Sequence, residues 1–107
     1  MFTVDVAYDV TDLGGGVLEG TAACAEAGRA PGDANPVGHH VTNIVPTEGG
    51  EGDEGGEGEV RALSKGLGLG SDGTCASVTY DDVVVRVGGR WRISRRTVTA
   101  RRTPLVA

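Results

Sequence analysis

The chain has 107 residues, of which 15 are acidic, 10 are basic and 19 are glycine, and its net charge is −5 at neutral pH. This length suits one domain with a thin core and is too short for two domains. The sequence holds no apolar run near the roughly 18 residues that span a membrane, and residues 1–5 do not read as a signal peptide. We therefore expect a soluble, cytoplasmic protein.

The net charge conceals an uneven distribution along the chain. Residues 48–59 consist of six acidic residues and six glycines, and the remainder of the chain carries +1. Seven of the ten basic residues lie between Arg86 and Arg102. Because residues 48–59 offer no apolar side chain to bury, we expect a mobile acidic loop within a single domain over 1–107.

The chain begins with a predicted strand and hairpin. Residues 2–10 alternate apolar and polar side chains, as strands with one buried face do. The glycines at 14–16 predict a turn, and residues 17–20 are the expected returning arm of a hairpin.

A short helix and a third strand are expected next. Thr21 stands at a helix N-cap position, residues 22–27 favour helix, and Gly28 is expected to end it. A loop over 31–36 then leads to residues 37–45, whose β-branched and polar residues predict a strand.

The final third of the chain gives the clearest strand pattern. Residues 60–69 predict a strand weakened by its glycines, and residues 71–73 predict a turn. Residues 78–87 and 91–100 are strands joined by a short glycine hairpin at 88–90. One helix followed by four antiparallel strands indicates the α+β class.

In this order, the segments resemble the SnoaL-like branch of the nuclear transport factor 2-like superfamily. The resemblance is carried by residues 2–10, 16–20, 39–43 and 80–96. It implies a cone-like α+β domain with a strongly curved antiparallel sheet. Members of the family begin with helices that close the mouth of the cone, whereas here Met1 falls where the first strand starts, so we expect these N-terminal helices to be lacking.

The adjacent histidines His39 and His40 are the first candidates for chemistry. Neighbouring side chains of a strand point to opposite faces, so only one of them can face a pocket. His39 would share its face with Asn43. The resemblance favours His39 as the pocket residue, since a dehydratase of the family uses a strand histidine in proton transfer, for which imidazole is suited. The alternative is a histidine that is hydrogen-bonded within or beside the sheet.

Four further residues are candidate substrate contacts. Tyr80 and Asp82 share one face of the strand over 78–87, where a hydroxyl can donate to a carbonyl oxygen and a carboxylate can move a proton. Asn43, on the face of His39, would orient or polarise the carbonyl together with Tyr80, and Tyr8 is the remaining candidate contact. Asp82 can equally form a surface ion pair with Arg86, and the face of the strand that lines the pocket stays open.

Several other kinds of site are not predicted. Adjacent strand histidines cannot ligate one metal ion, and no cofactor is implied. Cys24 and Cys75 have no neighbouring base and read as inert, reduced thiols. The glycines at 66–70 open no helix, so they are not a phosphate-binding loop.

The basic C-terminal strand does not predict nucleic-acid binding. One face of this strand is expected to carry Arg90, Arg92, Arg96 and Arg102, and the other Trp91 and Ile93. Stacking on nucleic acid needs exposed aromatic rings, and we expect Trp91 to face the core. A solvated charged sheet face is the better interpretation.

Two functions follow from the sequence. The first is a SnoaL-like isomerase, dehydratase or cyclase that moves a proton on a small apolar carbonyl compound, with His39 as acid and base. The alternative is a non-catalytic small-molecule-binding or dimerisation module. In either case a sheet without helical cover exposes apolar area, so we expect a homodimer.

Overall fold

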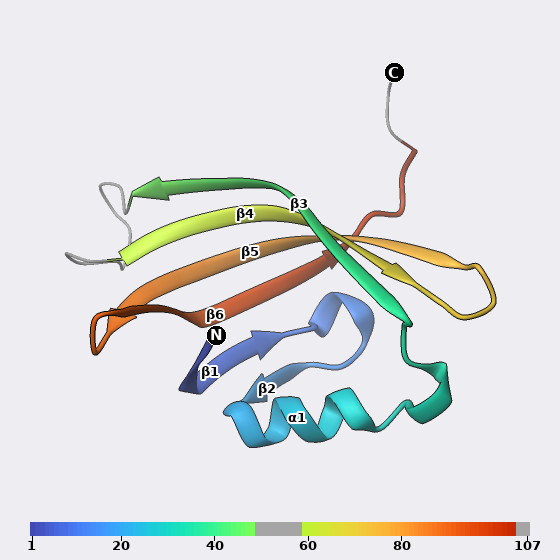
Figure 1. The fold of residues 1–107 in the computed structure, drawn as a ribbon, viewed down its shortest axis with the longest axis horizontal. Coiled ribbons are helices and arrows are strands. Elements are labelled where there is room, and N and C mark those ends of the chain that lie inside the picture. The colour runs from blue at the N-terminus through green and yellow to red at the C-terminus, as the bar shows by residue number, and fades with distance from the viewer. Residues whose placement is uncertain (49–58, 105–107) are drawn as a thin grey trace.

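The computed structural model describes residues 1–48 and 59–104, so most of the predicted acidic loop over 48–59 lies outside the described residues. The described part is an α+β domain built from one α-helix and a six-stranded sheet (Figure 1). The strands are β1 (Phe2–Asp9), β2 (Val17–Glu19), β3 (Gly38–Glu48), β4 (Glu59–Leu69), β5 (Cys75–Val87) and β6 (Arg90–Ala100), with the helix α1 (Thr21–Arg29) after β2. Short 3-10 turns occupy Thr11–Leu13 and Gly32–Ala34.

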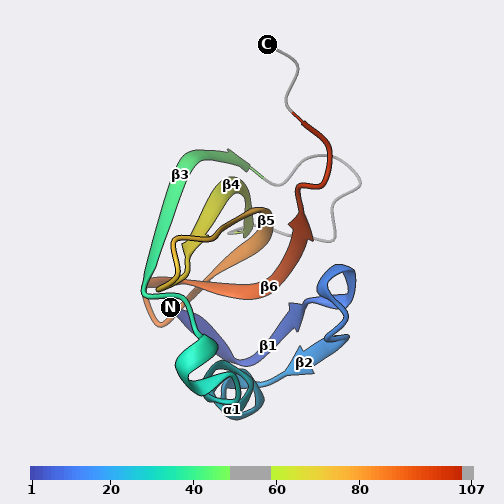
Figure 2. The ribbon, with the colours of Figure 1, turned by 90° about the vertical axis from the view of Figure 1, so that its right-hand side faces the viewer.

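The sheet has the strand order β2-β1-β6-β5-β4-β3. The last four strands form the predicted antiparallel meander, but β1 pairs with β6 in parallel, which makes the sheet mixed. Figure 2 shows that the sheet is strongly curved and not closed, and that β1, β2 and α1 lie opposite β3 across its concave side. The α+β class and the curved sheet are thus confirmed.

The helix is longer than the sequence pattern indicates. It begins at Thr21, with Gly20 rather than Thr21 in the N-cap position, and continues through Gly28 to Arg29. A single glycine weakens a helix by only about 1 kcal/mol. The carbonyl of Gly28 also accepts a hydrogen bond from the Asn35 side chain at 3.0 Å, which ties the end of the helix to the following loop.

The glycine turns agree with the predicted positions. Gly14 and Gly16 adopt positive φ between β1 and β2, and Gly88 and Gly89 do so between β5 and β6. Positive φ is accessible to glycine without steric strain, which explains glycine at these turns.

The buried apolar core is small. Among the described residues, the buried apolar side chains are Val6, Ile93 and Val98, of which Val6 alone is fully withdrawn from water. Trp91, predicted to face the core, is instead 49% exposed at the beginning of β6, where the Arg86 guanidinium lies 5.7 Å from its ring centre. No helix in the described ranges is long and apolar enough to cross a membrane.

Candidate functional site: a cavity between the helix and the concave sheet

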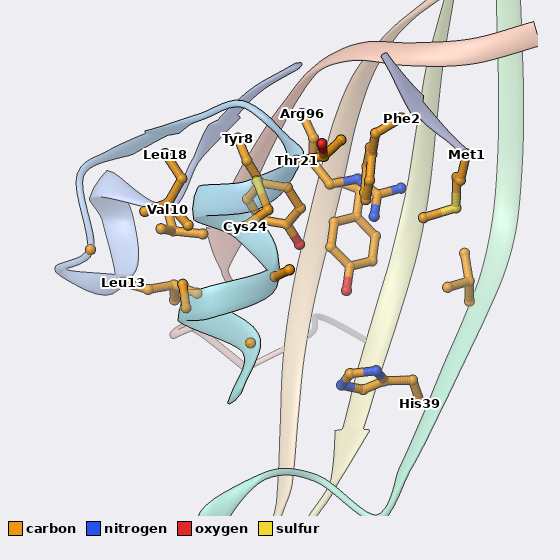
Figure 3. A pocket seen from close by; sticks show the side chains of 16 residues that line it. Met1, Phe2, Tyr8, Val10, Leu13, Leu18, Thr21, Cys24, His39 and Arg96 are labelled. Atoms are coloured by element: carbon orange, nitrogen blue, oxygen red, sulfur yellow. The ribbon is translucent and has the colours of Figure 1, made fainter. Parts of the chain in front are cut away.

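A cavity of about 760 Å³ lies between α1 and the concave face of the sheet (Figure 3). Its wall is mainly apolar, and its polar side chains come from separate elements. The residues that line it are Met1, Phe2, Tyr8, Val10, Leu13, Gly15, Leu18, Thr21, Cys24, Ala25, Ala27, Gly28, His39, Val41, Tyr80 and Arg96. A cavity of this size and lining suits a small, mostly apolar ligand.

The helix contributes a face of small side chains to this cavity. Thr21, Cys24, Ala25 and Gly28 are spaced by three or four residues, so they share one side of α1 and all line the space. Small residues here keep the cavity open. The free thiol of Cys24 lies among them.

A β-bulge in β6 sets the chemistry of the opposite wall. Val84 pairs with Ile93 and Val83 pairs with Arg95, so Ser94 is an extra residue on β6. The Ser94 hydroxyl donates to the carbonyl oxygen of Val83 at 3.3 Å. Because one inserted residue reverses the alternation of faces, the bulge brings Arg96 to the concave side.

Arg96 forms a buried ion pair with Asp82. Its Nε donates to Oδ1 at 2.8 Å and its Nη2 donates to Oδ2 at 2.9 Å. The side chains of Arg96 and Asp82 are only 12% and 6% exposed. A bidentate guanidinium–carboxylate pair holds both groups in one orientation and stabilises the charged form of each.

Three aromatic rings surround the Arg96 guanidinium. Its carbon lies 4.2 Å from the ring centre of Tyr80, 5.6 Å from that of Phe2 and 6.0 Å from that of Tyr8. The Phe2 and Tyr8 rings meet edge to face at 5.8 Å between centres. Such stacking favours the charged guanidinium and restricts its movement.

The electrostatics of this cluster keep Arg96 charged and Tyr80 protonated. Burial disfavours the guanidinium charge, but the hydrogen bonds and charge of Asp82, with help from Tyr8, raise the pKa of Arg96 above its ordinary value. Burial, reinforced by Tyr8 and opposed by Arg96, raises the pKa of Tyr80 above 10.0. The Tyr80 hydroxyl is therefore a hydrogen-bond donor at neutral pH.

His39 lines the other side of the cavity. It pairs with Gly68 on the edge strand β3, and Figure 3 shows its ring in the space between β3 and α1. His39 is nevertheless exposed to solvent, so it lies at the open side of the cavity. His40 pairs with Leu67 on the opposite face of β3, as the alternation predicts.

One glycine of β4, Gly66, makes room for the Tyr80 side chain. A Cβ on Gly66 would collide with the ring of Tyr80 and lie 2.9 Å from Cγ2 of Val78. A Cβ on Gly68 would meet His39 Cδ2 at 3.5 Å, which is an ordinary contact. Gly66 thus admits the Tyr80 ring against the backbone of β4.

The structure places three of the five predicted site residues on the cavity wall. His39, Tyr80 and Tyr8 line the cavity, and Asp82 lies behind it, engaged by Arg96. Asn43 does not line the cavity. It is exposed, with φ at 54°, within the irregular stretch of β3 between Thr42 and Val45. The catalytic and binding roles given to these residues stay predictions.

Arg96 is the residue that sequence reasoning misplaced. Strict alternation puts it with Arg90 and Arg92 on a solvated face, whereas the bulge at Ser94 moves it to the face of Trp91 and Ile93. No local signal in the sequence marks the bulge. Within residues 1–48 and 59–104, no three His, Cys, Asp or Glu residues gather as ligands for a metal ion.

Comparison with known protein families identifies the family of this chain. Residues 1–97 match the family model of the SnoaL-like domain. No curated protein matches the chain.

Solved structures share the fold at low sequence identity. A variant of a protein of unknown function from Mycobacterium tuberculosis has a TM-score of 0.74 at 22% identity over 95% of this chain and 57% of that chain. A protein classed provisionally as a scytalone dehydratase, from Novosphingobium aromaticivorans, has a TM-score of 0.66 at 20% identity over 94% and 66%. A hexachlorocyclohexane dehydrochlorinase of type 2 has 0.68 at 18% over 99% and 72%. The chain therefore spans less than two thirds of the first two structures.

Proposed function

Because the chain belongs to the SnoaL-like domain family, we propose that it catalyses isomerase- or dehydratase-type proton transfer on a small, mostly apolar carbonyl compound. The observation that carries this proposal is the largely apolar cavity of about 760 Å³ with His39 and Tyr80 on its wall. Such a reaction needs a proton acceptor and a donor to the carbonyl oxygen, both of which side chains can supply without a cofactor.

In this proposal His39 removes and returns the proton. A neutral imidazole is basic enough at neutral pH to act in both directions. The Tyr80 hydroxyl donates to the carbonyl oxygen and weakens the neighbouring C–H bond. The small side chains of α1 and the Tyr8 ring hold the apolar part of the ligand.

The sharpest test is exchange of the α-protons of ring ketones in heavy water, followed by NMR. We expect the protein to accelerate exchange over buffer and His39→Gln to lower the rate by about 10²-fold or more. His40→Gln is the matched control, since His40 lies on the opposite face of β3 and should leave the rate unchanged. No acceleration across a broad panel of ketones, or equal rates for His39→Gln, would contradict the proposal.

A non-catalytic small-molecule-binding module is the second candidate. It is favoured by the exposure of His39 and by the cavity lining, which includes no Asp or Glu among the described residues. A histidine that works alone lacks the carboxylate that often orients such a base. Saturable binding of ring ketones without accelerated exchange would select this candidate.

We further propose that two copies of the chain associate through the outer face of the sheet. Leu63 and Val45 are paired across β4 and β3 on the side away from Tyr80, and both are about half exposed. Exposed apolar patches of this kind commonly mark interfaces. Sedimentation velocity at micromolar concentration should give a dimer. We expect Leu63→Lys to weaken this dimer. A wild-type protein that sediments as a monomer would contradict the proposal.

A further inference from the structure

The donor groups of Arg96 are only partly used by Asp82. The carboxylate engages Nε and Nη2, which leaves Nη1 outside the bidentate pair. A guanidinium has more N–H donors than one carboxylate can accept. Arg96 also lines the cavity, where a side-chain hydrogen bond with Tyr8 further raises its pKa, so a ligand oxygen would share the remaining donors with the Tyr8 hydroxyl.

We propose that Arg96 is an oxyanion-binding residue, and that the ligand is a ring compound whose oxygen becomes negative, such as an enolate or a phenolate. This inference deepens the proposed function and rests on it for the reaction, although not for the binding. It assigns the charge-stabilising role to a residue other than the His39 base and the Tyr80 donor.

The Arg96–Asp82 ion pair suits a ligand oxygen that gains negative charge during the reaction better than a ligand that is charged throughout. Asp82 neutralises Arg96 overall, so the cavity has little long-range attraction for a carboxylate-bearing ligand. A hydrogen bond from a charged donor strengthens as its acceptor oxygen gains charge, most of all where water is excluded. The pair is thus suited to an oxygen that is neutral in the ketone or phenol and charged in the enolate or phenolate.

Rigid placement supports the same role. The bidentate bond to Asp82 and the Tyr80 ring at 4.2 Å hold the guanidinium before any ligand arrives. Donors that need no reorganisation are the most effective at stabilising charge. The Phe2 and Tyr8 rings next to Arg96 offer apolar surfaces that suit a flat ring ligand.

The inference is tested with 4-nitrophenol, whose phenolate and phenol differ in colour. The His39→Gln protein is used, so that the catalytic base does not take part. We expect the bound phenol to ionise at lower pH than the free one, by about one pKa unit, which is a preference of about tenfold for the phenolate. Ionisation at the same pH as the free phenol, or no binding at millimolar concentration, would overturn the inference.

Variants show whether Arg96 causes the preference. Arg96→Ala alone would leave Asp82 charged and buried, so the double variant Arg96→Met with Asp82→Asn removes both charges while keeping similar volume. We expect the double variant to bind the phenol and lose the preference. The control is Arg95→Gln, because Arg95 is exposed and pairs with Asp9 at 3.5 Å. A double variant that keeps the preference would contradict the assignment.

The two proposals fail in different ways. If α-proton exchange is absent but the phenolate preference depends on Arg96, the oxyanion site stands without the proposed reaction. If His39-dependent exchange occurs and 4-nitrophenol shows no preference, the reaction stands and the role of Arg96 is wrong.

Discussion

The two ends of the cavity differ in how firmly their polar groups are held. At one end Arg96 and Asp82 are buried, doubly hydrogen-bonded and stacked among aromatic rings. At the other end His39 is exposed on the edge strand β3 and packs beside Gly68.

This difference suits two chemical tasks. Stabilising a charge requires donors that are already in place, so burial and fixed hydrogen bonds are an advantage. A proton acceptor must regain its ordinary protonation state after each step, which contact with water allows. In the proposed reaction, the buried end would provide electrostatic stabilisation and the open end would provide proton exchange.

The largest expected effect is the loss of stability when the buried ion pair, rather than an exposed one, is broken. Asp82→Ala leaves the Arg96 charge buried without its partner and should lower the free energy of unfolding by about 3–5 kcal/mol. The matched control is Asp81→Ala, which breaks the Arg61–Asp81 pair whose side chains are 54% and 34% exposed. That loss should be about 1 kcal/mol or less. Urea denaturation measures both, and similar losses would show that burial is not what distinguishes the pairs.

The next largest effect is the difference in stability between alanine substitutions at Gly66 and at Gly68. Gly66→Ala forces the Tyr80 ring away from β4, and we expect a loss of about 1–3 kcal/mol in unfolding free energy. It should also weaken binding of 4-nitrophenol. Gly68→Ala meets His39 only at ordinary contact distance and should be close to neutral in stability. Equal losses for both variants would contradict the packing described for Tyr80.

The smallest effect concerns an exposed pair outside the cavity. The Arg102 side chain and the backbone N–H of Ala100 lower the pKa of Asp12 below 3.8. A carboxyl with a lower pKa in the folded protein stabilises it above the unfolded value, and this contribution disappears as the pH falls through the folded pKa.

Asp12→Asn removes that contribution at neutral pH. The variant should therefore lose slightly less stability than the wild-type protein between about pH 5 and pH 2, which urea titrations at both values would detect. Identical pH dependence in the two proteins would show that the Asp12–Arg102 contact does not form in solution.

The sequence predicts most of the strands because alternation of side chains and glycine turns are local features. Residues 78–87 and 91–100 show this clearly, since their hairpin forms as expected around Gly88 and Gly89. The parallel pairing of β1 with β6 joins the two ends of the chain, and no local pattern encodes it. The family resemblance supplied the curved fold that alternation alone could not.

The candidate site was predicted only in part. His39, Tyr8 and Tyr80 were found from strand alternation and from the resemblance, and they line the cavity. Arg96 was assigned to the wrong face because the count of residues along β6 ignores the extra Ser94. Asn43 was lost for a related reason, since the irregular stretch of β3 interrupts the face that it would share with His39.

The proposal that one ligand contacts both Arg96 and His39 is tested most directly by following both ends of the cavity in one NMR experiment. A ring ketone is titrated into ¹⁵N-labelled protein while the Arg96 Nε and His39 imidazole signals are observed. We expect both signals to shift with one common dissociation constant, while those of His40 and Arg61 stay unchanged. If the Arg96 and His39 signals stay still, or shift with different dissociation constants, the two ends of the cavity do not bind the same ligand.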